Sequence, residues 1–277
     1  MNLIDVEKAA RFAWPALEEQ EFSFGLLRYA QGVSRRANSL TVFPGADIHH
    51  DSLVDIAEQF FHERGQAAVI RILQSGDAGT HECISLDACL AQQNYRREAP
   101  TLVMSKTLGN DANAGAKPAC SDREIVSDAN ISTDDWLQAW YEFRGSDAAE
   151  LKIHRQIFAK IEGPVKLLLL KESQGNPISC AMGVINDEAI GIYGVATAAS
   201  CRGQGHAAAL IELLQQWAFE KDASYAYLQV ESANVAARGL YSKLGFSELY
   251  SYWYRIQNTE QTEAMPQGWH RLSEIGE

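Results

Sequence analysis

The stretch that decides the fold reads Val195-Ala-Thr-Ala-Ala-Ser-Cys-Arg-Gly-Gln-Gly-His-Ala-Ala-Ala-Leu210. It consists of the end of an apolar run, a turn with two glycines (residues 202–207, here the Arg202 turn) and the start of a helix-like segment. The first turn of a helix has N–H groups without intrahelical partners, and the helix dipole adds positive potential there. Glycine lets an anion approach the backbone closely, and Arg202 adds a fixed positive charge. The pattern therefore predicts a cradle for a pyrophosphate.

The sequence around this turn predicts an α+β architecture. Before it lie three apolar runs separated by polar breaks, which predict consecutive antiparallel strands at 165–171, 178–185 and 189–195. After it, leucines recur at helical spacing, and a strand, a helix and a last strand are predicted at 225–230, 235–244 and 249–256. We therefore expect a mostly antiparallel central sheet flanked by helices, with one strand–turn–helix–strand crossover.

A break in composition divides the chain. Residues 109–121 are rich in Gly, Asn, Asp and Ala and lack an apolar period, so they are the predicted linker. It separates a first domain, 1–108, from a second, 122–277, each of ordinary domain size. Strand-like and helix-like segments of the first domain follow an order resembling that of the second, without a glycine-rich turn and without a residue-level repeat.

Composition excludes several function classes. The 277 residues carry a formal net charge of −12, which argues against general nucleic-acid binding and mildly favours a cationic partner such as an amine. Five cysteines without a CxxC pair and seven scattered histidines indicate neither a disulfide framework nor a metal site. No membrane-spanning run and no signal pattern is present, so we expect a cytoplasmic protein.

A second motif follows at Asn234-Val-Ala-Ala-Arg-Gly-Leu-Tyr241-Ser-Lys-Leu-Gly-Phe246. It resembles the N-x-x-A-x-x-L-Y-x-x-x-G-F block of the GNAT N-acetyltransferase superfamily. Arg202-Gly-Gln-Gly-His-Ala207 is similar to that superfamily's R/Q-x-x-G-x-G/A signature, with alanine at the last position. The resemblance covers about residues 122–257. The first half looks like a degenerate relative of the same fold, as in tandem members of the superfamily.

The resemblance implies an N-acetyltransferase that uses acetyl-CoA, without a metal, to acetylate a primary amine. It also implies contacts between the CoA and a specific set of residues. Val195 and Thr197 meet the acyl and pantetheine parts, and the pyrophosphate is met by Cys201, Arg202, Gly203, Gln204, Gly205, His206 and Ala207. Asn234 bonds the pantetheine arm, although it also suits the N-cap of the following helix. A purely geometric role for the glycines is the alternative for the turn itself.

By the same resemblance, Tyr241 is the general acid that protonates the departing thiolate, since a phenol of pKa about 10 is protonated at neutral pH. A core aromatic is the alternative. The general base is not identified. The superfamily's ribosomal-protein acetyltransferases have a glutamate where this chain has Gln229. Glu231, two residues on and on the same strand face, is a possible base or a solvated charge. Glu188 and water-mediated deprotonation stay open.

The acceptor is an unidentified small-molecule or peptide amine. Trp136 and Trp140 share a helix face that predicts core more readily than an amine-binding wall. Arg35-Arg36 is a second polar cluster that either faces the acceptor or forms a solvated turn. A non-catalytic CoA-binding or interaction module with this fold is the alternative function, and the sequence does not reveal the oligomeric state.

Overall fold

The computed structural model describes residues 1–46, 48–74, 81–109, 123–127, 131–146 and 148–258. Contacts divide the chain into two compact units. Unit 1 comprises Met1–Ala13, Met104–Gln229 and Ala236–Ser247, and unit 2 comprises Trp14–Val103, Val230–Val235 and Glu248–Glu277. The predicted division into residues 1–108 and 122–277 stays a prediction. The two compact units are not continuous in sequence, since the first helix belongs to unit 1 and nearly all of the last strand to unit 2. Apart from Gly109, the predicted linker lies outside the described residues.

Unit 1 is built on strands in the order β5-β10-β9-β8-β7-β6. Its elements are α1 (Leu3–Ala13), the end of β5 (Tyr95–Thr107), β6 (Arg123–Ser127), α4 (Thr133–Arg144), η3 (Ala148–Glu150), α5 (Leu151–Ala159), β7 (Val165–Glu172), β8 (Pro177–Asn186), β9 (Ala189–Thr197), η4 (Ala199–Cys201), α6 (His206–Phe219), β10 (Tyr225–Glu231) and α7 (Val235–Lys243). β7, β8 and β9 are antiparallel, and β10 runs parallel to β9. The predicted antiparallel run and the crossover through the Arg202 turn are therefore confirmed.

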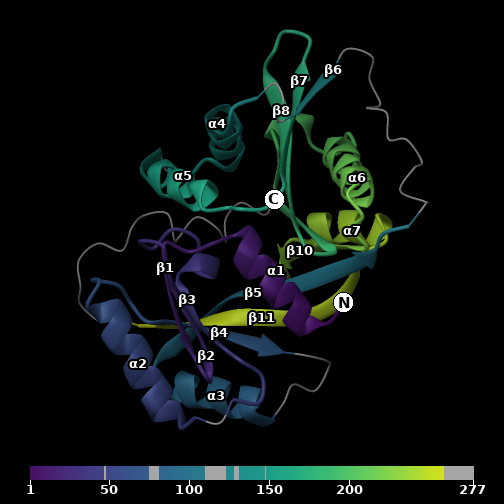
Figure 1. Ribbon diagram of the computed structural model, residues 1–277. Coiled ribbons are helices and arrows are strands. Elements are labelled where there is room, and N and C mark those ends of the chain that lie inside the picture. The colour runs from purple at the N-terminus through teal and green to yellow at the C-terminus, as the bar shows by residue number, and fades with distance from the viewer. Residues whose placement is uncertain (47, 75–80, 110–122, 128–130, 147, 259–277) are drawn as a thin grey trace. The chain divides into compact units, whose positions relative to one another are not determined.

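Helices cover both faces of β8, and its sequence explains why. Eight consecutive residues, Ile178–Ile185, are buried, which is typical of a strand covered on both sides. α4 and α6 both contact β8, and Figure 1 shows them on opposite sides of the β7–β8 hairpin. α1 also packs on β8 and β9, through buried residues at helical spacing, namely Val6, Ala9, Ala10 and Ala13.

Unit 2 has strands in the order β1-β2-β3-β4-β11-β5. Its elements are β1 (Glu18–Phe22), β2 (Gly25–Tyr29), η1 (Arg35–Ala37), β3 (Ser39–Val42), α2 (His50–His62), β4 (Val69–Gln74), α3 (His81–Gln92), most of β5 and β11 (Ser247–Gln257). β1, β2 and β3 are antiparallel, β3 and β4 are parallel, and β11 pairs antiparallel with β4.

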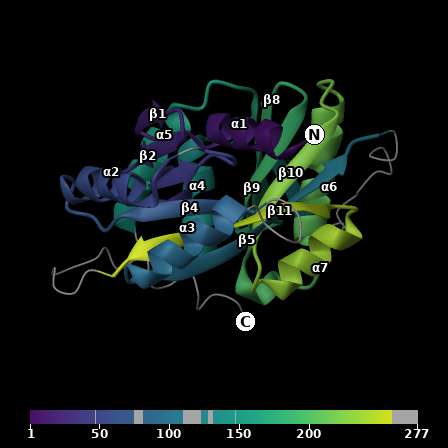
Figure 2. The same cartoon turned by 90° about the horizontal axis from the view of Figure 1, so that it is seen from below.

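The core of unit 2 lies on one face of these strands. α2 and α3 both contact β4, and they lie on the same side of the strands in Figures 1 and 2. One cluster joins both helices to the strands, with buried Leu40, Ile70, Ile72 and Trp253 facing Leu53, Phe61 and Leu90. The expected α+β fold, a mixed sheet flanked by helices, is confirmed in both units.

Candidate active site

A β-bulge interrupts the end of β9. Cys180 pairs with Ala196 and Met182 pairs with Tyr193, so Ala181 faces both Gly194 and Val195. Gly194 has a φ of 58°, and a Cβ built on it would lie 2.4 Å from Cη2 of Trp136. Only glycine fits this backbone conformation and this space. Sequence reasoning did not predict the bulge, although a glycine inside an apolar run is its usual signal.

Beyond the same point β9 and β10 stop pairing. Their parallel register joins Ala189–Ile192 to Tyr225–Leu228 and ends there, whereas β9 continues to Thr197. The hydroxyls of Tyr193 and Tyr227 meet at 2.9 Å where the pairing ends. The last residues of β9 are half-buried rather than enclosed. The sheet edge around Val195 is therefore splayed.

Side chains hold the end of β9 in place. The buried Ser179 hydroxyl donates to the carbonyl of Ala196 at 2.9 Å and lies 2.8 Å from the Thr197 hydroxyl. Nε of Arg202 donates to the carbonyl of Thr197 at 3.3 Å, which ties the strand end to the turn that follows. Val195 and Thr197 thus sit on a fixed strand end that leads directly into the Arg202 turn.

The Arg202 turn is exposed at its centre and contains two glycines. Arg202–Gly205 are exposed, whereas the flanking Cys201 and His206 are buried. Gly203 and Gly205 have φ values of 73° and 81°, and a Cβ on either would meet nothing within 4 Å. Gly205 is the N-cap of α6 and provides no side-chain cap. The glycines satisfy a backbone geometry that other residues adopt poorly, and they also leave open space in front of the N–H groups of α6.

Tyr241 lies on α7 and is 8% exposed. Its ring packs edge-on against Phe246, which supports the core alternative. Its hydroxyl, however, has no hydrogen-bond partner among the described residues. Burial raises the pKa of Tyr241 to about 12, because the phenolate is poorly solvated there. The side chain is a packed core aromatic that also keeps a protonated, uncommitted hydroxyl.

The predicted residues near the end of β10 fall on the division between the units. Gln229 is half-buried in unit 1, whereas Glu231 and Asn234 belong to the segment Val230–Val235 of unit 2. Asn234 is exposed, directly precedes α7 and donates its N–H to the carbonyl of Glu231 at 2.9 Å. The candidate site described here accordingly consists of unit 1 residues, and the roles of Glu231 and Asn234 stay predictions.

The aromatic stripe on α4 is core. Trp136 and Trp140 are 0% and 5% exposed and stack on each other, and the indole N–H of Trp136 donates to the carbonyl of Leu168 at 3.0 Å. Next to them Tyr141 hydrogen-bonds to Nδ1 of the buried His154. Burial lowers the pKa of His154 to about 3, with the Arg144 guanidinium acting in the same direction. Sequence reasoning did not find this pair.

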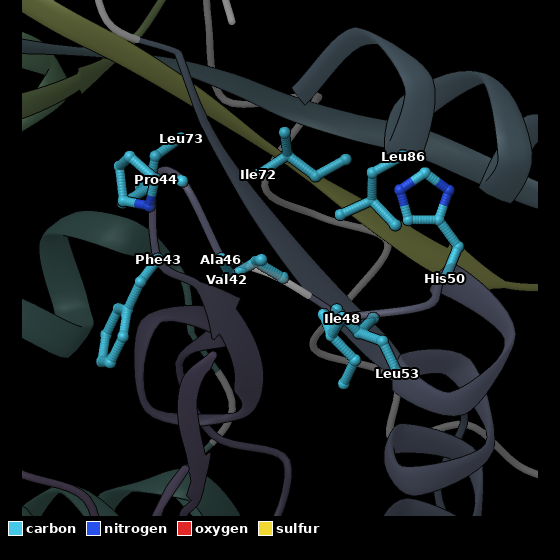
Figure 3. Close-up of a pocket in the computed structure, with 11 residues that line it drawn as sticks. Val42, Phe43, Pro44, Ala46, Ile48, His50, Leu53, Ile72, Leu73 and Leu86 are labelled. Carbon is cyan, nitrogen blue, oxygen red and sulfur yellow. The ribbon is translucent and has the colours of Figure 1, made fainter. Parts of the chain in front are cut away.

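Unit 2 has its own strand-to-helix turn, between β3 and α2, and this turn is apolar. Residues 43–46, 48 and 49 lie between the two elements in the described chain. Figure 3 shows apolar side chains, among them Phe43, Pro44 and Ile48, around a small pocket of about 40 Å³ whose other residues are Val42, Gly45, Ala46, His50, Leu53, Ile72, Leu73 and Leu86. This turn has one exposed glycine at a positive φ, Gly45, where the Arg202 turn has two.

Within the described ranges, no three His, Cys, Asp or Glu side chains gather in a way that would hold a metal ion. No helix there is both long and apolar enough to cross a membrane.

Comparisons with known proteins match nearly the whole chain. The model of the family described as "Probable histone acetyltransferase Rv0428c C-terminal" matches residues 2–255. The chain is 25% identical over 255 residues to the "Uncharacterized N-acetyltransferase YobR" of Bacillus subtilis, covering 91% of this chain and 97% of that protein.

Solved structures resemble the fold. A GCN5-related N-acetyltransferase from Kribbella flavida superposes with a TM-score of 0.65 at 14% identity, covering 94% of this chain and 97% of the other. A tandem GNAT protein from the clavulanic acid biosynthesis pathway gives a TM-score of 0.65 at 11% identity, covering 93% and 89%.

Proposed function

We propose, because the chain belongs to the Rv0428c C-terminal acetyltransferase family and to the GNAT superfamily, that this acyltransferase moves an acetyl group directly from acetyl-CoA to a primary amine. The observation that supports this most lies in unit 1, where the end of β9 leads directly into the Arg202 turn. A bulged, splayed strand end runs into a turn whose two left-handed glycines face open space at the start of α6. The acceptor is a small molecule or peptide amine.

The residues of the Arg202 turn suit a pyrophosphate. Gly203 and Gly205 leave room for an anion in front of the N–H groups of the first turn of α6. The positive end of the helix dipole lies at this N-terminus. Arg202 adds a cation that is already oriented by its bond to the Thr197 carbonyl. The proposed contacts of Cys201, Gln204, His206 and Ala207 are with their backbone groups. Acetyl-CoA, when bound, supplies an activated thioester.

The end of β9 is the proposed site of the acyl group. Donors aimed at a developing oxyanion stabilise it most when they are held rigidly. The bulge turns Val195 out of the regular ladder, and Ser179 holds the next two residues from the neighbouring strand. The backbone of Val195 is therefore the proposed hydrogen-bond donor to the acyl carbonyl, and Thr197 is a proposed contact to the pantetheine.

Tyr241 is the proposed general acid. A general acid must hold its proton at working pH and must not be committed to another acceptor. The pKa of Tyr241, raised to about 12, meets the first condition. The second is met because its hydroxyl has no hydrogen-bond partner among the described residues. The phenol would give its proton to the departing thiolate while the amine forms its bond to the acyl carbon.

Glu231 is the proposed base in place of the carboxylate that Gln229 does not provide, with water-mediated deprotonation and Glu188 as the other routes. A base must be deprotonated to act, so kcat/KM for the amine falls on the acidic side of the pH profile. Changing Glu231→Gln should remove that acidic limb. An unchanged limb excludes Glu231 from the role.

A screen of amines with the purified protein and acetyl-CoA tests the proposal as a whole. Free thiol release, followed by mass spectrometry of the amine, should show a mass increase of one acetyl group for at least one acceptor. The control is the same screen with Gly205→Val, which should release no thiol above the rate of spontaneous hydrolysis. Saturable CoA binding without turnover on any amine would contradict the proposed function.

A further inference from the structure

Two hydroxyls face each other across the end of the β8–β9 pair. Ser179 on β8 is 0% exposed, and its register partner on β9 is the half-buried Thr197. Directly opposite residues of neighbouring strands have adjacent side chains on the same face of the sheet. Gly183 shares that face of β8, and a Cβ built on it would lie 3.0 Å from Cδ2 of Leu214 on α6. Ser179 and Thr197 therefore lie on the face that α6 covers, and all of these residues belong to unit 1.

The contacts of Ser179 fix which of the two hydroxyls donates. Its Oγ lies 2.9 Å from the carbonyl oxygen of Ala196 and 2.8 Å from Oγ1 of Thr197. A serine hydroxyl has one proton to donate and two lone pairs, whereas a carbonyl oxygen only accepts. The Ser179 proton is therefore directed to the Ala196 carbonyl. The hydrogen bond between the two hydroxyls is accordingly donated by Thr197 and accepted by Ser179.

This arrangement leaves the Thr197 hydroxyl as an acceptor. A threonine hydroxyl normally serves as donor or acceptor, because its proton rotates to suit the partner. Here the single proton of Thr197 is used toward β8, so only the lone pairs of its oxygen remain for a further partner. Turning the proton outward would break a hydrogen bond of the fully buried Ser179, and a buried polar group that loses a partner is costly. The Thr197 side chain thus favours a ligand group that donates a hydrogen bond over one that accepts.

The backbone around Thr197 is held on both sides. The N–H of Ala198 donates to the carbonyl of Ile178 at 2.9 Å, and Nε of Arg202 donates to the carbonyl of Thr197 at 3.3 Å. The Ser179 hydroxyl adds a further bond, to the carbonyl of the residue before Thr197. An acceptor that is fixed before its ligand arrives binds more tightly than a mobile one, since less conformational freedom is lost on binding.

We propose that Ser179 is a positioning residue that makes the Thr197 hydroxyl a dedicated acceptor for an amide N–H of the pantetheine arm of CoA. This inference rests on the proposed function, since it assigns a direction to a hydrogen bond with CoA. The expected donor is the amide nearest the sulfur, because Thr197 lies only two residues, about 7 Å, beyond the proposed acyl site at Val195. An ester oxygen in place of that N–H would meet lone pairs instead of a proton.

Titration calorimetry on the full chain tests the direction of this hydrogen bond without requiring turnover. The ligands are CoA and an analogue in which the amide nearest the thiol is replaced by an ester, so that an oxygen stands in place of the N–H. The unaltered chain should bind CoA at least about tenfold more tightly than the ester, because the ester loses one hydrogen bond and opposes two acceptors. Equal dissociation constants, as expected of a freely rotating Thr197 hydroxyl, would overturn the inference.

Variants assign the preference for CoA to the two hydroxyls. Thr197→Val keeps the shape of the side chain but has no acceptor, so CoA and the ester should bind within about twofold of each other. In Ser179→Ala the Thr197 proton is released and turns to the ester oxygen, so the preference should shrink at least about threefold. A purely structural role of Ser179 would weaken the binding of both ligands by the same factor, and an unchanged ratio would therefore contradict its positioning role.

Thr197→Ser is the conservative variant, and it should keep the preference because it keeps the hydroxyl. Thr197 is only half-buried, so its variants test the inference even if Ser179→Ala does not fold. Ser132→Ala is the matched control, since the Ser132 hydroxyl caps α4 by accepting from the N–H of Asp135 and its loss should affect stability alone.

Two results separate this inference from the proposed function. A preference for CoA that persists in Thr197→Val would contradict the inference alone, because CoA would still bind. A failure of the unaltered chain to bind CoA would contradict both the inference and the proposed function.

Discussion

The two units connect their strands in the same order and directions, but they differ at one strand-to-helix turn. In unit 1 the antiparallel run β7–β8–β9 is followed by α6 and by β10, parallel to β9. In unit 2 the antiparallel run β1–β2–β3 is followed by α2 and by β4, parallel to β3. The turn after β9 has two exposed glycines next to Arg202, whereas the turn after β3 has one, Gly45, and lines a small apolar pocket. A shared topology therefore does not provide an anion cradle, which depends on the residues of the turn.

The largest effect is expected from a matched pair of glycine substitutions. Gly205→Val and Gly45→Val both place a side chain at a positive φ, 81° and 76°, where nothing else lies within 4 Å. Each should lower the free energy of unfolding by about 1–2 kcal/mol. Only Gly205→Val should reduce kcat/KM for acetyl-CoA, by about 1,000-fold, since it displaces more than one charge-assisted hydrogen bond. Equal kcat/KM values of the two variants would contradict a role in acetyl-CoA binding for the Arg202 turn alone.

Tyr241→Phe should lower kcat by about 100-fold, the usual contribution of a general acid. KM for acetyl-CoA should stay the same, because the hydroxyl bonds no described part of the site. In the unaltered chain kcat should not fall on the basic side below pH 10, since a phenol with a pKa of about 12 stays protonated there. Steady-state kinetics across pH measure both. Tyr95→Phe is the control in unit 2, where the hydroxyl donates to Glu58 and a change should affect stability alone.

Asp87→Asn perturbs unit 2 without touching the Arg202 turn. The Asp87 carboxylate accepts two hydrogen bonds from Arg255, both at 2.7 Å, and one from the Trp253 indole. Burial works to raise the pKa of Asp87, but these bonds outweigh it and the pKa is lowered. The substitution should cost about 2 kcal/mol of unfolding free energy, the usual value of hydrogen bonds to a charged group.

The sign of the pH dependence provides the check on Asp87. A lowered pKa stabilises the folded state above the unfolded value of about 3.9, and this stabilisation is lost as pH falls through the folded value. Urea unfolding at several pH values should therefore show a constant gap between the two proteins near neutrality that closes on acidification. A gap that persists at low pH would contradict an ionised Asp87.

The smallest effect is expected from Arg202→Gln. It removes one exposed charge but leaves the backbone N–H groups of α6 in place, so KM for acetyl-CoA should rise about tenfold while kcat stays unchanged. The rise should shrink at high salt, because exposed charges are screened. Arg155→Gln is the control, since Arg155 is an exposed arginine of unit 1 paired with Asp134. A fall in kcat alone would assign Arg202 a role other than binding.

Local signals made much of unit 1 predictable. Predicted strands at 178–185 and 189–195 and a helix at 235–244 match β8, β9 and α7 to within two residues, because period and breakers act over short distances. The Trp136–Trp140 stripe was correctly expected to be core. The structural features that sequence reasoning missed depend on pairing between distant segments. The bulge at Gly194 requires knowing that β8 lies opposite, and the Tyr193–Tyr227 contact requires the parallel register with β10.

The strand pairing of the buried Arg71 shows the same limit in unit 2. Arg35-Arg36 was noted as a polar cluster without a definite role, and Arg71 drew no attention among apolar neighbours. The meaning of Arg71 depends on Thr41 and Tyr254 beside it, and these come from segments 30 and 183 residues away along the chain. Such separations leave no trace in a local period.

The assignment of β11 to unit 2 has a consequence for how the protein is made. β11 lies between β4 and β5, yet it is synthesised some 140 residues after them. On the ribosome the two strands must wait with open edges until the last described residues emerge, and open edges invite pairing with other chains. The first half of the chain therefore does not finish folding first, and production of the protein should be sensitive to chaperone supply and to any premature stop before residue 247.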